Sequence, residues 1–500
     1  MAKRDNRIKY NVLTGLVYQV VLIVLSFLLP RVYLENFGSE VNGVLSTIKQ
    51  IFVYLFLLES GVGLATTQAL YKPVAEKNYG NVNAILSATN QFYVKIGFLY
   101  AAIVLVIATV YAFIIPTGVS SGVIFGVIVL TALPALFSYF IQSKYRILLE
   151  VDGRKYVITT SEMVLQLLSN VAKILVLVFT NDLLLMQLAY CLLSLLQLAY
   201  VYYHAKRRYA EWLNMKAEPD YEAISQRKSV LVHQVSGMVF NNTDVLLLSF
   251  LCDFKIVSVY TVYHIFFSQV QNFITSIISG FSFSLGQMFH VDRERFNKVY
   301  NLYETVYIMA TFIIYTLMAV FLLPLVQIYT QGITDANYTN ALLVFLFVLM
   351  NLLANGKLPS NHLLEYSGKF EETRSHAIWE MVINLTVSVV AILKWGICGA
   401  VLGTIVALIY RGSMMIYYAN KHVLERSVFD TYKLWLVNGA VFAVVMCVFF
   451  VDSFSGLSFV QLLLQGVLHT LWIVPLYIVV NFICFRRVLK NLPMLWRGKT

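Results

Sequence analysis

The sequence predicts an all-α polytopic membrane protein with about 14 transmembrane helices, arranged as two pseudo-symmetric six-helix lobes followed by two C-terminal helices. Three observations predict this fold class. First, 59% of the 500 residues are hydrophobic, only 13% are charged, and the mean hydropathy is +0.73. A water-soluble domain could not bury that much apolar surface. Second, the chain is divided into apolar segments of membrane-spanning length. Third, two pairs of these segments are similar to each other in sequence.

Each predicted helix has the length that a bilayer requires, which is roughly 20 mostly apolar residues. The first helix follows the basic stretch "MAKRDNRIKY" and has no small-residue cleavage site after it, so we expect a retained helix rather than a signal peptide. The predicted spans are, in order, 12–34, 43–68, 91–115, 122–146, 156–179, 183–204, 231–252, 256–288, 300–329, 339–362, 375–395, 398–420, 434–451 and 459–484.

The distribution of lysine and arginine predicts the orientation, because these residues are enriched in cytoplasmic loops. With the N-terminus in the cytosol, only Arg31, Lys255 and Lys394 fall in outside loops or in the span ends beside them, out of 37 basic residues. Both chain ends are then cytoplasmic. The net charge of +11 is therefore a topology signal, and we expect no nucleic-acid partner.

The predicted spans group into four parts of the chain. Residues 1–205 form an N-terminal six-helix lobe, 206–230 a charged cytoplasmic linker, 231–425 a C-terminal six-helix lobe, and 426–500 helices 13 and 14 with a basic cytoplasmic tail. No loop between spans is long enough to hold a soluble domain. The five cysteines lie in or beside apolar segments without metal-binding spacing, so neither disulfides nor zinc are expected.

An internal repeat supports the two-lobe arrangement. The stretch "EMVLQLLSNVAKILVLVF" from Glu162 and the stretch "EMVINLTVSVVAILKWGI" from Glu380 share seven of their 18 positions. A second, weaker similarity links "TGLVYQ" at 14–19 with "SGMVFN" at 236–241. Both pairs relate one helix to the sixth helix after it. Parallel repeats of this kind occur in transporters that move two helix bundles around a central site.

Asp244 is the most informative residue, because a carboxylate at membrane depth is costly and usually functional. It lies about 20 Å from the start of its predicted helix at 1.5 Å per residue, in the stretch "NNTDVLLLSFL". Asn241 is on the same helix face. Ser268, Asn272 and further small polar residues line one face of the next helix. This pattern predicts the wall of a wet cavity, although small polar residues also pack membrane helices together.

Other charged residues within the spans have competing interpretations. Lys49 and Arg411 lie deep enough to bind an anionic substrate, whereas Arg411 could equally form a structural pair with a carboxylate. Lys173 is near a helix end, so we expect its side chain to reach the interface. Glu162 and Glu380 occupy matching repeat positions near the predicted inner mouth, where a gate role competes with simple interfacial solvation.

These features together resemble the polysaccharide flippases (Wzx-type) of the multidrug/oligosaccharidyl-lipid/polysaccharide exporter superfamily. The resemblance covers the whole chain in layout. It is carried locally by "NNTDVLLLSFLCDFKIVSVYTVY", "LLPRVYLENFGSEVNGVLSTI" and "WGICGAVLGTIVALIYR". The first helix contains no internal arginine, unlike the lipid II flippase branch. Capsule, O-antigen or exopolysaccharide units are therefore favoured over a peptidoglycan precursor.

The resemblance implies a bacterial plasma-membrane flippase that works by alternating access. Its cargo would be an undecaprenyl-diphosphate-linked oligosaccharide, and its surroundings the membrane lipids and other polysaccharide assembly proteins. Lys49 and Arg411 would bind the diphosphate. Asp244 and Asn241, completed by Asn384 and Thr404, would couple a sodium ion or a proton, or Asp244 would pair with a base such as Arg411. No other cofactor is implied.

Two other classes of protein compete with this interpretation. A multidrug antiporter of the same superfamily would share the fold and use buried carboxylates for cationic drugs. A membrane polysaccharide polymerase or ligase would need a large external loop with catalytic residues, and the external loops here are short. We therefore expect a protein that is not an enzyme. The chain has no nucleotide-binding motif, which argues against an ATP-driven pump.

Overall fold

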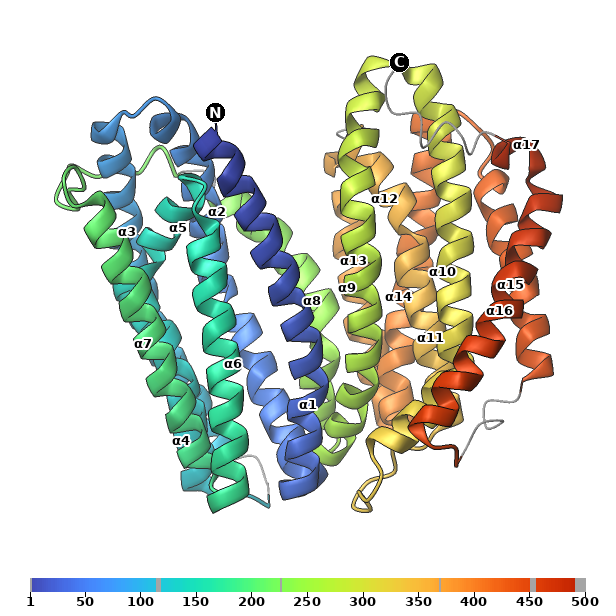
Figure 1. The fold of residues 1–500 in the computed structure, drawn as a ribbon, viewed down its shortest axis with the longest axis horizontal. Helices are drawn as coiled ribbons and strands as arrows, with labels where there is room; N and C mark the ends of the chain where they lie inside the picture. Colours follow the sequence, from blue (N-terminus) through green and yellow to red (C-terminus); the bar gives the residue numbers. More distant parts are fainter. Residues whose placement is uncertain (1, 114–117, 225–226, 368–369, 450–455, 491–500) are drawn as a thin grey trace. The chain divides into compact units, whose positions relative to one another are not determined.

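The computed structural model describes residues 2–113, 118–224, 227–367, 370–449 and 456–490, and the regular secondary structure within these ranges is entirely helical. The chain divides into two compact units, which we call unit 1 (Met1–Asn242) and unit 2 (Thr243–Thr500). Within each unit the helices run side by side as a bundle (Figure 1). The predicted all-α fold class is confirmed.

Unit 1 contains seven helices and the first part of an eighth. The first helix is interrupted at Gly38, whose φ of 77° and ψ of −176° lie in a region that side chains other than glycine rarely adopt. This interruption separates the first predicted span from the second. The helices are α1 (Ala2–Leu55), α2 (Leu57–Ala75), α3 (Tyr79–Phe113), α4 (Ser121–Phe137), α5 (Ser143–Val151), α6 (Lys155–Thr180), α7 (Leu183–Tyr209) and α8 (Arg227–Leu251).

The fourth predicted span is one continuous path with an irregular middle. Pro134 lies near the end of α4, and the chain then widens into a π-helix, η1 (Ser138–Gln142), before α5 begins. Proline lacks a backbone N–H and disturbs the preceding helical turn, so a local change of winding beside it is expected. The part of the span formed by α5 is therefore a separate short segment.

Unit 2 contains the remaining helices, and its tenth predicted span is also divided. The division lies at Lys357, between α11 and α12, where Pro359 is near the start of the second segment. The helices are α9 (Phe254–Val291), α10 (Arg293–Tyr329), α11 (Ala341–Gly356), α12 (Leu358–Tyr366), α13 (Phe370–Trp395), α14 (Ile397–Tyr418), the π-helix η2 (Ala419–Leu424), α15 (Phe429–Val448), α16 (Phe459–Cys484) and α17 (Arg486–Leu489).

Helices α13 and α14 form a closely packed hairpin. A Cβ atom at Gly403 would lie 2.1 Å from Ser388 Oγ and 2.6 Å from Ser388 N, and one at Gly399 would lie 2.2 Å from the carbonyl oxygen of Ala391. Glycines four residues apart let the two backbones approach, as is common between membrane helices. The hairpin therefore has one fixed register, which sets the positions of the polar residues on both helices.

The last two spans are joined to α10 by buried polar contacts. Glu304 of α10 forms an ion pair with Arg426 and accepts a hydrogen bond from Thr431 Oγ1 at 2.8 Å. Farther along the same helix, the hydroxyls of Thr316 and Tyr477 lie 2.7 Å apart. Polar contacts of this type fix the way in which membrane helices pack. Helices α15 and α16 therefore belong to unit 2 as packed elements.

Eleven helices within the described residues are long and apolar enough to cross a membrane. Among them, Gln19–Glu59, from α1 and the start of α2, overlaps the first two predicted spans, and Ala341–Tyr366, from α11 and α12, corresponds to the tenth. The seventh and eighth predicted spans correspond to α8 and α9, and parts of their side chains lie outside the described portion of the chain.

Candidate functional site

A buried carboxylate forms the centre of the candidate site in unit 2. Asp244 lies on α8 and is only 7% exposed. Tyr260 Oη, from α9, donates a hydrogen bond to Asp244 Oδ2 at 2.8 Å. Thr404 Oγ1, from α14, lies 3.1 Å from the same oxygen and 3.4 Å from Asp244 Oδ1. Two helices, α9 and α14, thus direct hydroxyl groups at one carboxyl group on a third helix, α8.

A fourth helix extends this arrangement through Asn384 of α13. Its side-chain amide Nδ2 donates to Thr404 Oγ1 at 2.8 Å, and Asn384 is only 1% exposed. Since the threonine hydroxyl accepts this bond, its own proton is available for Asp244. The chain of hydrogen bonds therefore runs from Asn384 through Thr404 to Asp244, which also accepts from Tyr260. We call these four residues the Asp244 cluster.

The charge of Asp244 has no counter-charge in this cluster. Among the described residues, no lysine, arginine or histidine lies within ion-pairing distance of its carboxylate. A buried carboxylate is strongly disfavoured unless a cation or a proton neutralises it. The cluster presents carboxylate, hydroxyl and phenol oxygens, and oxygen atoms are the ligands that hard cations prefer. It therefore fits one monovalent cation or a proton.

The composition of the cluster argues against a divalent metal centre. Across the described ranges, no group of three or more histidine, cysteine, aspartate or glutamate residues could hold a metal ion. A single carboxylate with neutral oxygen donors instead suits an ion of charge +1.

Arg411 lies beside a different carboxylate from the one considered in the sequence. Its Nε is 3.5 Å from Glu380 Oε2, and its Nη1 donates to the carbonyl oxygen of Thr373 at 3.0 Å. Lys357 Nζ also pairs with Glu380, at 2.6 Å from Oε1. The alternative of a structural carboxylate pair for Arg411 is therefore the one observed, and pairing of Arg411 with Asp244 is wrong. The reason is that Arg411 lies two helical turns beyond Thr404 on α14.

Glu162, the repeat partner of Glu380, forms an equivalent ion pair in unit 1. Arg146 Nη2 lies 2.6 Å from Glu162 Oε1. In each unit the glutamate begins the repeated Glu-Met-Val stretch. Its basic partner lies in the preceding divided span: Arg146 on α5, and Lys357 at the break where α12 begins. The two ion pairs therefore tie the short segments α5 and α12 to the helix that follows each of them.

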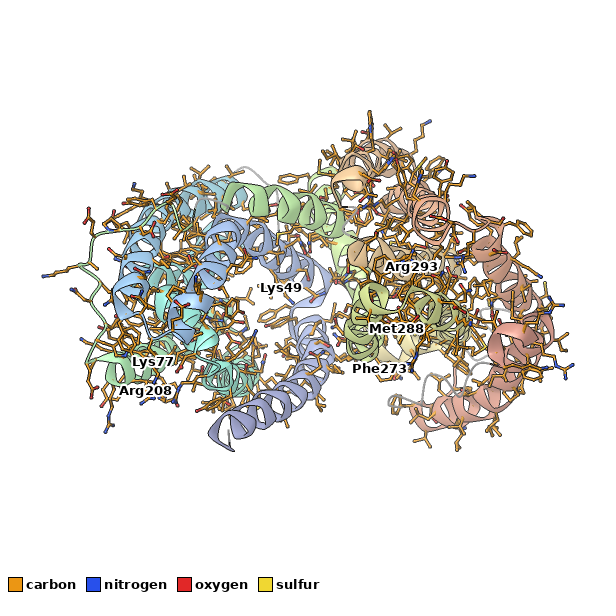
Figure 2. All side chains as sticks on the ribbon, turned by 90° about the horizontal axis from the view of Figure 1, so that it is seen from above. Lys49, Lys77, Arg208, Phe273, Met288 and Arg293 are labelled. Carbon is orange, nitrogen blue, oxygen red and sulfur yellow. The ribbon has the colours of Figure 1, made fainter. Side chains whose placement is uncertain are left out.

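The side chain of Lys49 has no acidic partner among the described residues. Lys49 is an exposed residue of α1. Figure 2 shows it within the ring of unit 1 helices, whereas Lys77 and Arg208 lie on the outer rim of that unit.

The other polar residues predicted for the site have different positions. Asn272 is exposed on α9, 12 residues beyond Tyr260, which corresponds to about 18 Å along the helix. It does not contribute to the Asp244 cluster. The side chain of Asn241 lies outside the described residues, as do several serines of the predicted polar stripe on α9.

Tyr260 is the residue of the cluster that the sequence did not indicate as functional. It is 4% exposed and packs against Phe347, with ring centroids 5.2 Å apart. A tyrosine in an aromatic-rich apolar helix has the pattern of an ordinary core residue. The available signal was its place 16 positions after Asp244 in the quoted Val-x-x-Tyr stretch.

Comparison with solved structures identifies proteins of the same fold. The lipid II flippase MurJ, in an inward closed conformation, is 12% identical with a TM-score of 0.69, over 96% of this chain and 100% of that one. A multidrug resistance MATE family transporter of the MOP superfamily, inward-facing, is 11% identical with a TM-score of 0.63, over 81% and 95% of the two chains. An outward-facing structure of such a transporter has 12% identity and a TM-score of 0.55, over 85% and 96%.

Neither protein-family models nor curated sequences gave a match to this chain. At these identities the structural matches establish the fold alone. That fold is shared by a lipid II flippase and by multidrug resistance MATE family transporters.

Proposed function

We propose that this protein is a flippase that moves undecaprenyl-diphosphate-linked oligosaccharide units from the inner to the outer leaflet of the bacterial plasma membrane. The movement would occur by alternating access and serve export of a surface polysaccharide. Sodium ions or protons bound at Asp244 would drive it. The coupling proposal rests on one observation. The Asp244 carboxylate has no counter-charge in its cluster and accepts hydrogen bonds from the hydroxyl groups of Tyr260 and Thr404.

The cargo assignment is supported by a cation that the fold leaves available. Lys49 is accessible inside unit 1 without an acidic partner among the residues described there. Such a group attracts a phosphate and repels a cationic drug. The fold match to a lipid II flippase adds support for a lipid-linked cargo as a class. We assign diphosphate contact to Lys49 and not to Arg411, because the Arg411 guanidinium already lies beside the Glu380 carboxylate and donates one hydrogen bond to the Thr373 carbonyl.

The coupling proposal follows from how the Asp244 cluster joins helices. Asp244 and Tyr260 lie on α8 and α9, whereas Thr404 and Asn384 lie on the α13–α14 hairpin. A cation bound among them would draw these helices together, and its release would leave a buried negative charge that favours their separation. Differential affinity of an ion for two conformations is what allows it to shift their populations.

We also propose a gating role for the Glu162–Arg146 and Glu380–Lys357 ion pairs. Each joins a short segment after an irregularity in a span to the next helix. Helices interrupted by proline or π-turns can change direction at the interruption at lower cost than regular helices. Breaking the ion pair would free the segment, and forming it would hold the segment in place.

A multidrug antiporter is the second candidate. A buried carboxylate such as Asp244 would serve a cationic drug as well as a coupling ion, and MATE transporters have the same fold. The positive charge of Lys49 would repel a cationic cargo in unit 1. It has no bearing on whether a cationic drug binds at Asp244 in unit 2.

Complementation distinguishes the two candidates. A bacterial strain that lacks its repeat-unit flippase receives this gene together with the matching glycan cluster, as wild type, Asp244→Asn or Lys49→Met. Surface polysaccharide, stalled lipid-linked units and resistance to cationic drugs are measured. We expect the wild type to restore export and both variants to accumulate stalled units at normal protein levels.

Asp253→Asn is the matched control for the aspartate variant. Asp253 caps α9 by accepting a hydrogen bond from Ile256 N at 2.9 Å, and asparagine caps helices about as well. This variant should therefore export normally. Wild-type cells that gain drug resistance without restored polysaccharide would overturn the flippase proposal in favour of the antiporter.

A further inference from the structure

We propose that residues 331–340, which connect α10 to α11, form a strap that holds Tyr260 in place for ion binding at Asp244, and that this strap acts through the hydroxyl group of Tyr263. The inference rests on the proposed function, because it adds a means of regulation to the same ion site. Tyr263 and Tyr338 are positioning residues in this account, since both act on the Asp244 carboxylate through Tyr260.

The strap is fastened to α9 by buried contacts. The Tyr338 side chain is only 3% exposed, and its hydroxyl lies 2.8 Å from Ser258 Oγ on α9. The Tyr263 hydroxyl, from the same helix, donates a hydrogen bond to the Tyr338 carbonyl oxygen at 2.7 Å. It also accepts a hydrogen bond from Asn340 N at 3.3 Å. These contacts hold the end of the strap against the first three turns of α9.

The Tyr263 hydroxyl also fixes the start of α11. Asn340 is the N-cap of that helix, and its side chain accepts a hydrogen bond from Leu343 N at 3.0 Å. Farther along α11, the Phe347 ring packs against Tyr263 with centroids 5.6 Å apart, and against Tyr260 at 5.2 Å. Protein interiors are close-packed, so the position of α11 limits how the Tyr260 ring can turn.

The strap and the ion site lie near the same end of unit 2. Asp244 is seven residues before the end of α8 and Thr404 is seven residues after the start of α14, so both lie about 10 Å from that end. The strap contacts α9 within its first ten residues, and it lies at the lower edge of unit 2 in Figure 1. The basic loops predict that this end faces outside.

These contacts couple the strap to the ion. The hydrogen bond from Tyr260 Oη to Asp244 Oδ2, 2.8 Å long, needs a ring held in one orientation. A seated strap therefore raises the affinity of the Asp244 cluster for an ion. By thermodynamic linkage, a bound ion favours the seated strap by the same factor. The strap is thus held more tightly when the site is occupied than when it is empty.

Ion binding to the purified full-length protein tests the proposal. The unfolding temperature is measured against sodium, with choline replacing it at constant ionic strength, and separately against pH. The coupling ion is the one whose effect Asp244→Asn abolishes. We expect Tyr263→Phe to weaken the affinity for that ion about three- to tenfold, as for loss of one neutral hydrogen bond. Tyr477→Phe removes a buried hydroxyl that lies 2.7 Å from Thr316 Oγ1 in the same unit, and should leave the affinity unchanged.

A double-variant cycle separates positioning from a general structural effect. Tyr260→Phe alone should weaken ion binding more than Tyr263→Phe does. Because Tyr263 acts through Tyr260, the variant with both substitutions should bind the ion as Tyr260→Phe does, within about twofold. Hydrogen exchange measured by mass spectrometry gives the reciprocal readout. The ion should slow exchange of the amides of residues 331–340 in the wild type and should have no such effect in Asp244→Asn.

The outcomes distinguish this inference from the proposed function. If Asp244→Asn removes neither the sodium response nor the pH response, ion coupling at Asp244 fails, and the inference fails with it. If the wild type responds and Tyr263→Phe binds the ion equally well, only the strap is wrong. An effect of Tyr263→Phe that adds in full to that of Tyr260→Phe also overturns the strap alone. Should Tyr263→Phe not fold, Tyr338→Leu, which removes the buried ring of the strap, is held to the same criteria.

Discussion

Replacing Thr404 by valine tests the structure of the Asp244 cluster most sharply. Valine has nearly the shape of threonine, so packing around the site is preserved while the hydroxyl is lost. That hydroxyl lies 3.1 Å from Asp244 Oδ2 and accepts the amide of Asn384 at 2.8 Å. The variant therefore removes one oxygen from the proposed cation site and leaves the Asn384 amide without the partner that it has now.

The magnitude follows from these two contacts. A hydrogen bond to a charged group contributes about 1.5–3 kcal/mol, which corresponds to a roughly 10- to 100-fold weaker cation affinity. Sodium at 100 times its dissociation constant stabilises the wild type by about 2.7 kcal/mol. For a 100-fold weaker variant, the same sodium concentration equals the dissociation constant, and the stabilisation falls to about 0.4 kcal/mol.

The assay is the sodium-dependent rise in unfolding temperature of the purified protein, with choline replacing sodium at constant ionic strength. Thr404→Ser keeps the hydroxyl and should retain most of the sodium response. Thr330→Val removes a buried hydroxyl of unit 2 that donates to Val326 O at 2.8 Å on its own helix, and should leave the response unchanged. A full sodium response in Thr404→Val would refute the role of this hydroxyl.

Three further predictions concern helix packing, a buried ion pair and the backbone of α1, and thermal unfolding of the purified protein checks each of them. Gly403→Ala should lower the free energy of unfolding by about 1–3 kcal/mol through the clash with Ser388, whereas Gly412→Ala on the same helix, where the nearest atom is 3.9 Å away, should be nearly neutral. Equal stability of the two variants would contradict the close α13–α14 packing. Arg426→Met should lower the free energy of unfolding by about 3–5 kcal/mol, because it leaves the Glu304 side chain, which is 2% exposed, as a buried unpaired charge. The double variant with Glu304→Met should recover most of that free energy. No recovery would contradict the pairing. Gly38→Ala should cost about 1–3 kcal/mol because alanine is strained at φ 77°, and an unchanged unfolding temperature would show that α1 has no such break.

The sequence predicted the fold class and most spans because each span must be long and apolar, and that property is local. The breaks within the divided spans could be predicted from the sequence only in part. Pro134 and Pro359 indicated some irregularity, whereas the position of the break at Gly38 depends on a backbone conformation that glycine permits but does not require. The helices α15 and α16 were predicted as an appendage, and their polar contacts with α10 depend on packing that no local pattern contains.

The candidate site was predictable to the extent that polar residues are conspicuous in apolar helices. Asp244, Asn384 and Thr404 were all identified, and the structure brings these three together. The partner of Arg411 could not be predicted, because it depends on the register of the α13–α14 hairpin, which close approach at Gly403 determines.

The most direct test of the central claim is ion-driven flipping by the purified protein. The protein is reconstituted in liposomes that contain a fluorescent undecaprenyl-diphosphate-linked oligosaccharide, and flipping is followed by quenching of the exposed label. Sodium and proton gradients are imposed separately, with wild type, Asp244→Asn and Asp253→Asn. We predict that one of the two gradients accelerates flipping by the wild type and by Asp253→Asn, and that Asp244→Asn loses this acceleration. Flipping that ignores both gradients, or an Asp244→Asn variant that responds like the wild type, would contradict the account.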